Sequence, residues 1–408
     1  MRRRVALIAV VLGACGTCGD AQPEPAASAD RARADPRAAP AGPRAIAAAA
    51  AFDLVASGAG ALLIWGTPAD DGGAVKLVLL DAFGSPRGGE RVLFARASGV
   101  TSDAVEVAAA GAAGRIGIAW VSRAGDRLEA MATHGSATGE AFAPPESLGA
   151  VDAIALEPGR ARGLLAAAAA ADGNVGILHR REEEQCPSGE SSEGERCVGF
   201  SMHRLGGSPG GSGRSGVGLI APSPCDRGVV GYVWSAGVWY YGVCTMRGGR
   251  QATTVYAIQP DPEYAHAERV LDGCEPLAIA AVDRGAVITG RCGEARGAGA
   301  RIAAVELLEA AQRRRDLHAT RGAILCEDGH PAVMRTGDGA PIARVLSGPS
   351  SGLEAFLPEE LAPAGARAVW TGDALLVAHP VAGEGVATRV VLGRYQCVGS
   401  GLVRTDVP

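Results

Sequence analysis

Three glycine-rich segments have the spacing of known catalytic or phosphate-binding motifs. Residues 206–210 and 348–352 match Gly-x-Ser-x-Gly, in which Ser208 or Ser350 would be a nucleophile if a strand led through a sharp turn into a helix. Residues 211–216 match Gly-x-Gly-x-x-Gly, which holds a pyrophosphate at a helix N-terminus. No helical pattern follows any of the three segments. We therefore predict surface loops without catalytic or cofactor-binding residues.

Acidic and histidine side chains offer little for a metal. Six glutamates surround two cysteines in one polar loop: Glu182, Glu183, Glu184, Glu190, Glu193 and Glu195. They lack the Asp-x-Asp-x-Asp-Gly spacing of an ordered calcium loop, and the seven histidines contain no His-x-x-His pair. We predict a solvated loop, no bound metal and no cofactor.

Aromatic residues are sparse, at 4% of the chain, except near residue 240. Trp239, Tyr240 and Tyr241 follow Trp234 closely, and strand alternation would place Trp239 and Tyr241 on one face and Tyr240 on the other. Exposed, they could stack on sugar rings or anchor a protein partner. Buried, they would fill the space between sheets, and this second interpretation is the one we favour.

Cysteines indicate an oxidising compartment. Two of the ten, Cys15 and Cys18, lie near the N-terminus, and an even number remains in the body of the chain: Cys186, Cys197, Cys225, Cys244, Cys274, Cys292, Cys326 and Cys397. Such a set in an exported protein favours disulfides over metal binding, although eight cysteines allow 105 pairings.

Local spacing narrows these pairings. Cys274 and Cys292 lie almost equidistant from a turn at residues 283–285, as opposite residues of a hairpin would. Cys225 and Cys244 flank a similar turn at 235–237, and Cys186 and Cys197 bracket the acidic loop. Cys326 and Cys397 remain as the last pair, whose disulfide would close a longer loop.

The body reads as short strands separated by Gly- and Asp-rich turns, with little helical periodicity. Apolar runs such as 61–65, 74–80, 115–121 and 238–243 recur in units of about 50 residues, with starts near 52, 103, 152, 224, 274, 323 and 367. This spacing predicts an all-β protein, a β-propeller of about seven four-stranded blades. Two-sheet β-sandwich domains are the alternative. Residues 306–315 fit a helix as well as a strand.

The N-terminus has the pattern of an export signal: Arg2, Arg3 and Arg4 precede an apolar run at residues 5–12. Leu12, Gly13, Ala14 and Cys15 then resemble the lipobox of bacterial lipoproteins. The resemblance implies a signal peptide at residues 1–14, a diacylated Cys15 and anchoring in a membrane, and Gly16 in place of aspartate implies the outer membrane. An ordinary secretory signal is the alternative.

Residues 15–50 are rich in Ala and Pro and predict a flexible tether, which leaves 51–408 for the propeller. A net charge of −5 and a pI near 5.9 argue against nucleic acid as a partner. We expect a tethered module that binds an envelope protein or glycan. The alternative is an envelope polysaccharide hydrolase or lyase whose carboxylates converge at the propeller mouth.

Overall fold

The computed structural model divides the chain into Met1–Ala39 and Pro40–Pro408, and every residue that it describes belongs to the second unit. The described residues are 44–49, 51–58, 60–68, 73–94, 104–124, 127–151, 163–181, 197–205, 218–222, 224–247, 250–260, 263–282, 285–292, 301–309, 313–317, 324–327, 330–334, 341–344, 365–382 and 388–405. The predicted tether and signal peptide therefore lie almost wholly outside the described residues.

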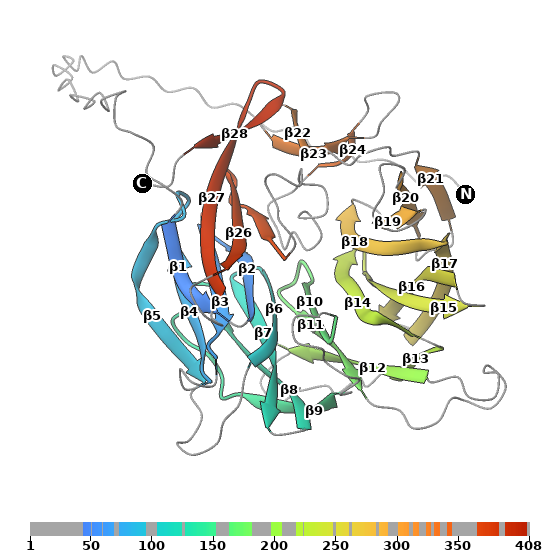
Figure 1. Cartoon of the computed structure of the whole chain (residues 1–408), viewed down its shortest axis with the longest axis horizontal. Coiled ribbons are helices and arrows are strands. Elements are labelled where there is room, and N and C mark those ends of the chain that lie inside the picture. The colour runs from blue at the N-terminus through green and yellow to red at the C-terminus, as the bar shows by residue number, and fades with distance from the viewer. Residues whose placement is uncertain are drawn as a thin grey trace, which may run out of the picture. The chain divides into compact units, whose positions relative to one another are not determined.

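The described part of the chain is all β, and within each sheet the strands pair antiparallel, in chain order except where β1 joins the last sheet (Figure 1). The first three sheets contain β2 (Ala51–Ser57), β3 (Gly60–Gly66), β4 (Val75–Leu80) and β5 (Pro86–Phe94); β6 (Ala104–Ala112), β7 (Arg115–Ala124), β8 (Arg127–Ser136) and β9 (Glu146–Val151); and β10 (Leu165–Ala169), β11 (Val175–Arg181), β12 (Cys197–Leu205) and β13 (Gly218–Pro222). The next two contain β14 (Pro224–Ser235), β15 (Val238–Arg247), β16 (Arg250–Pro260) and β17 (Glu263–Asp272); and β18 (Cys274–Val282), β19 (Gly285–Cys292), β20 (Arg301–Leu308) and β21 (Arg313–Leu317).

The remaining two sheets close the ring. A small sheet contains β22 (Ile324–Glu327), β23 (His330–Met334) and β24 (Pro341–Arg344), and the last contains β25 (Arg367–Trp370), β26 (Leu375–Ala382), β27 (Thr388–Val398) and β28 (Gly401–Thr405). The most N-terminal described strand, β1 (Arg44–Ala49), joins this last sheet by pairing with β27, with Arg44 opposite Leu392. The two ends of the propeller thus share one blade.

Apolar clusters fill the interfaces between successive sheets. Five such clusters occupy five interfaces, and strand alternation sends neighbouring residues into different ones. In β3, Leu63 packs toward the last sheet and Leu62 toward the second, and both are fully buried. Burial on both faces explains why β3 reads as a continuous apolar run. The first strands of the first five sheets pack beside one another in order, and β25, the first strand of the last sheet, packs beside β2. We call these six strands the inner strands: β2, β6, β10, β14, β18 and β25.

The all-β propeller is confirmed, with two corrections of detail. Within the described residues six sheets have four or more strands and one has three, so there are six complete blades rather than seven. Inner strands begin within a residue of the predicted unit starts except in the third sheet, where β10 begins at Leu165 rather than at 152. The ambiguous residues 306–315 contain the end of β20 and the start of β21, and these two strands pair antiparallel with Leu308 opposite Arg313.

Candidate functional site on the inner strands

Asp53 is an acidic residue near the start of the apolar inner strand β2. Its Oδ2 accepts the backbone N–H of Ala109 on the next inner strand, β6, at 2.7 Å, and its Oδ1 accepts the N–H of Leu54 at 2.9 Å. The Nε of Arg367, on β25, lies 3.3 Å from Oδ1. Burial raises the pKa of Asp53, while the Arg367 charge and the backbone donors oppose that rise. Asp53 therefore joins the inner strands of three sheets.

Glu106 has the equivalent place on β6. Its Oε1 accepts the backbone N–H groups of Gly163 at 3.0 Å and Leu165 at 3.4 Å, and its Oε2 accepts that of Leu164 at 2.9 Å. These donors form the entry to inner strand β10. Burial raises the pKa of Glu106 to about 7, although the three N–H donors and the charge of Arg367 lower it. Glu106 thus fastens the second sheet to the third.

Arg367 acts on both carboxyl groups, so the three side chains form one electrostatic unit, the inner-strand charge cluster of Asp53, Glu106 and Arg367. A carboxyl group whose pKa lies near 7 can donate a proton at neutral pH, which is the chemistry of a general acid. Here, however, the oxygens of both carboxyl groups already accept backbone N–H groups. The arrangement is therefore suited first to aligning neighbouring blades.

A second polar group lies between the second and third sheets. The rings of His179 on β11 and His203 on β12 stack with centroids 4.9 Å apart, and both residues are buried. Burial, with smaller contributions from the charges of His203 and Arg181, lowers the pKa of His179 to about 3. The His179 ring is therefore neutral at physiological pH. Among the described residues, no three His, Cys, Asp or Glu side chains gather as metal ligands would.

The three candidate binding aromatics are core residues. Trp239 is 2% exposed and Tyr240 and Tyr241 are fully buried, so none of the three presents a face to a ligand. Trp239 and Tyr241 face the third sheet and Tyr240 faces the fifth, as strand alternation predicts. Aromatic side chains can either bind ligands or fill the core. Here all three fill the space between neighbouring sheets.

Tyr232, Trp239, Tyr241 and Tyr256 form the aromatic cluster of the fourth sheet. The rings of Tyr241 and Tyr256 stack at 4.8 Å, and those of Tyr232 and Trp239 at 5.1 Å. Gly176 on β11 makes room for this cluster, because a Cβ there would lie 2.6 Å from the Tyr232 hydroxyl oxygen. The cluster packs the third and fourth sheets together.

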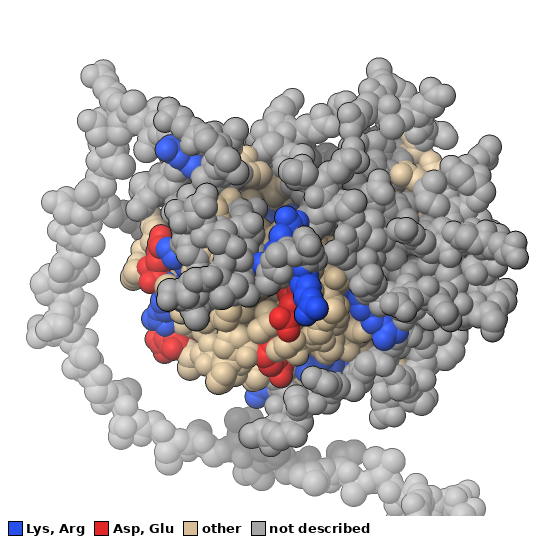
Figure 2. Space-filling model, turned by 60° about the horizontal axis from the view of Figure 1, so that its bottom comes forward, with Lys and Arg blue, Asp and Glu red and all other residues tan. Residues whose placement is uncertain are grey.

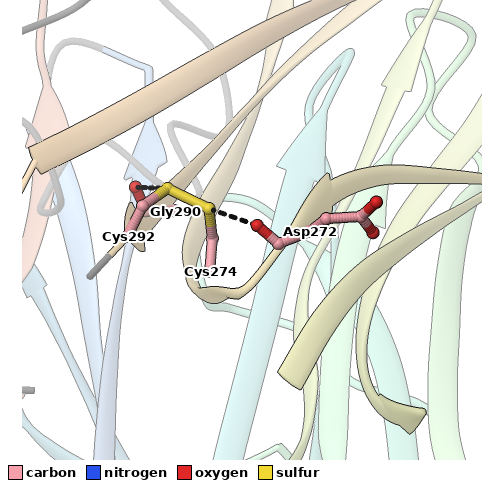
Figure 3. Close-up of a disulfide and its surroundings, with 4 residues drawn as sticks. All are labelled: Asp272, Cys274, Gly290 and Cys292. Carbon is pink, nitrogen blue, oxygen red and sulfur yellow. Dashed lines mark hydrogen bonds between the residues drawn. A yellow bond between two sulfur atoms is a disulfide. The ribbon is translucent and has the colours of Figure 1, made fainter. Parts of the chain in front are cut away.

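Two of the predicted cysteine pairs are disulfides in the structure: Cys274–Cys292 and Cys326–Cys397. Cys274 and Cys292 are directly opposed in β18 and β19, and their sulfurs lie 3.3 and 3.9 Å from the carbonyl oxygens of Asp272 and Gly290 (Figure 3). A disulfide sulfur carries no hydrogen, so these are close contacts. Cys244 is also disulfide-bonded.

Other predicted positions cannot be placed. Residues Cys15, Cys18, Cys186, Ser208 and Ser350, the 211–216 segment and the acidic loop lie outside the described residues. Cys197 falls in β12 and Cys225 in β14, and at these two positions only the backbone is described. No helix in the described parts is long and apolar enough to cross a membrane.

Asp53, Glu106 and Arg367 were not singled out from the sequence. A signal was present: a single acidic residue interrupts an otherwise apolar strand at the start of two successive units, in Phe52-Asp53-Leu54 and Val105-Glu106-Val107. A lone carboxylate among buried side chains needs hydrogen-bond donors, so its recurrence indicates a structural role.

No protein-family model matches the sequence, and a search of curated proteins finds no match. Solved structures resemble it in fold. The β-propeller domain of the trilobed protease from Pyrococcus furiosus is 8% identical, covering 90% of this chain and 97% of that one with a TM-score of 0.43. The polysaccharide lyase Uly1 is 9% identical, covering 90% and 91% with a TM-score of 0.42. A Trypanosoma rangeli sialidase is 11% identical with a TM-score of 0.38; the match covers 77% of this chain and about half of the sialidase, 55%.

Proposed function

We propose that this chain is an extracytoplasmic lipoprotein, anchored through Cys15, whose β-propeller binds a protein or glycan of the cell envelope. Disulfides support the extracytoplasmic part. Cys274–Cys292 and Cys326–Cys397 are formed and Cys244 is also oxidised, and such bonds persist outside the reducing cytosol. The lipid anchor rests on the likeness of residues 12–15 to a lipobox, and two acyl chains would hold the protein stably on a membrane.

The case for binding rather than catalysis rests on how the carboxyl groups of the inner-strand charge cluster are used. In many glycoside hydrolases two free carboxyl groups flank the scissile bond, one as acid and the other as base or nucleophile. Asp53 and Glu106 have the required residue type, but their oxygens accept the N–H groups of residues that they must hold in place. Removing those contacts for chemistry would leave buried donors without acceptors. This occupancy is the observation that favours binding over catalysis.

The surface also suits contact with a partner through mixed polar interactions. Basic and acidic side chains are interspersed over the described part of the face in Figure 2. On the outer strand β5, Arg87, Glu90 and Arg91 are exposed beside Val92. Interfaces of non-obligate complexes are as a whole about as apolar as the rest of a protein surface, so this mixture is compatible with a binding face.

One observation supports a second candidate function, that of a polysaccharide hydrolase or lyase. Burial raises the pKa of both inner carboxyl groups, to about 7 for Glu106, so that group is partly protonated at neutral pH as a general acid must be. The two functions differ in what they do to a bound polysaccharide: an enzyme releases new chain ends, whereas a binding module retains the polymer intact.

Two measurements test the proposal. Radioactive palmitate should label the full-length protein, and the label should vanish with Cys15→Ser but persist with Cys18→Ser; a persistent label on the first variant contradicts the lipoprotein assignment. The purified protein should then be incubated with defined envelope polysaccharides and peptidoglycan. Retention without new reducing ends or unsaturated sugars supports binding. Release of products that Asp53→Asn or Glu106→Gln abolishes would establish the enzyme instead.

A further inference from the structure

Among the described residues, Cys326 joins the small sheet β22–β24 to the last blade both covalently and by a hydrogen bond. Cys326 on β22 forms its disulfide with Cys397 on β27, and its backbone N–H donates to the carbonyl oxygen of Ser400 at 3.2 Å. Its sulfur also lies 3.3 Å from the carbonyl oxygen of Gly401. All three partners belong to the hairpin formed by β27 and β28.

This attachment differs from that of the other sheets. Inner strands of neighbouring sheets elsewhere pack beside one another, whereas β22 packs chiefly on β27 and β28, at the outer side of the last blade (Figure 1). The small sheet has three short strands of four or five residues, which pair through only a few residues each. The Cys326–Cys397 bond adds a covalent link between this small sheet and the last blade.

We propose that the Cys326–Cys397 disulfide is a redox clasp, whose exchange with a dithiol releases the β22–β24 sheet from the last blade. Cys326 is 8% exposed, while Cys397 is only half-buried, so Cys397 is the sulfur open to attack. The proposed co-reactant is a dithiol, either a small molecule or a protein with two neighbouring cysteines.

The exchange balances as follows. One thiolate of the dithiol attacks the Cys397 sulfur, the Cys326–Cys397 bond breaks, and Cys326 leaves as a thiolate that takes up a proton. The second thiolate of the dithiol then attacks the mixed disulfide and releases Cys397 as a thiol. The dithiol is oxidised to a disulfide, and the protein gains two thiols. Among the described contacts, the hydrogen bond from the Cys326 N–H to Ser400 and the packing of β22 on β27 and β28 then connect the small sheet to the hairpin.

The other described disulfide provides a matched comparison. Cys274 and Cys292 belong to adjacent strands of one sheet, and the ladder between β18 and β19 continues beyond them to Val282 and Gly285. Reducing that bond leaves the two strands paired. Opening it therefore loosens one edge of a blade but releases no sheet.

Hydrogen exchange of the full chain tests the clasp. In the double variant Cys326→Ser/Cys397→Ser, amides of β22–β24 should exchange at least about tenfold faster, while those of β6–β9 keep their protection. The control Cys274→Ser/Cys292→Ser should leave β22–β24 unchanged. Unaltered exchange of β22–β24 in the first variant, or an equal loss of protection in every sheet, would overturn the proposal.

A second measurement examines the chemistry in the native protein. Limiting dithiothreitol followed by alkylation and mass mapping should label Cys326 and Cys397 while the blades stay folded. Absence of label on both cysteines in the folded protein would contradict exchange at the clasp.

Discussion

Replacing Glu106 by glutamine isolates the effect of one buried carboxyl group on stability. The unfolded chain titrates this group near 4.5, whereas burial in the folded protein raises its pKa to about 7. The folded state therefore binds the proton more tightly, so the stability contributed by the protonated group is present in full below pH 4.5 and is lost as the pH rises toward 7. Each pKa unit corresponds to about 1.4 kcal/mol, which gives a total of about 3 kcal/mol.

The assay is urea unfolding of wild type and Glu106→Gln from pH 4 to pH 8. Glutamine resembles the protonated acid, and its carbonyl oxygen can still accept from the entry of β10. Relative to the variant, the wild type should lose about 3 kcal/mol of unfolding free energy between those pH values. Glu129→Gln is the control, because Glu129 is an exposed carboxylate of the same sheet that accepts the Ser147 hydroxyl at 2.5 Å.

The contrary result is well defined. If wild type gains stability relative to Glu106→Gln as the pH rises, the three backbone donors outweigh burial and the carboxylate is the preferred form in the fold. A difference that does not change with pH would mean that burial and hydrogen bonding cancel. Either result would refute the argument that burial dominates at Glu106.

Three further substitutions are expected to destabilise the fold or change its pH dependence. Gly176→Ala forces a methyl group into the aromatic cluster and should cost about 1–3 kcal/mol by thermal or urea unfolding, whereas Gly89→Ala, with nothing within 4 Å, should cost little. Asp53→Ala removes the acceptor of the partly buried Ala109 N–H and a partner of Arg367, and should lower the free energy of unfolding by about 1–3 kcal/mol in urea. Lowering the pH from 8 to 5 should reduce the free energy of unfolding of wild type by about 2 kcal/mol relative to His179→Phe. The reason is that the buried, neutral His179 ring takes up a proton when the protein unfolds.

Each of these has a result that would count against it. Full stability of Gly176→Ala would show that the aromatic rings can move apart freely. Equal stability of Asp53→Ala and wild type would show that water replaces the lost contacts. A His179→Phe protein that follows the wild-type pH profile would place the histidine in contact with solvent.

The architecture was predictable because it repeats. Turn residues and short apolar runs recur at nearly constant spacing, so the first strands of six of the seven described sheets begin where the unit starts predict. The prediction failed at the third unit, where residue 152 directly follows β9 and β10 begins only at Leu165. The Asp-Ala-Ile that begins there imitates the start of the preceding unit, and sequence spacing alone cannot distinguish a connection from a strand.

The site was less predictable, because it depends on contacts across sheets. Strand alternation correctly divided Trp239 and Tyr240 between two faces, but only the packed structure shows that both faces are covered. Glu106 acts on residues 163–165, far along the chain, and Arg367 acts on it from the last blade. Such links arise from the curvature of the ring, which no local pattern encodes.

The pairing of β1 with β27 joins segments that are synthesised at different times. Translation produces β1 among the first parts of the propeller, yet its partner residues, up to Leu392, emerge nearly last. Until then the first strand has no edge to join, and closing a loop of this length is entropically costly and slow. Unpaired strand edges invite association with other chains, so a chain in which β1 and β27 have not yet paired is exposed to aggregation. A fragment that ends before residue 388 lacks every partner residue of β1 and leaves the ring open.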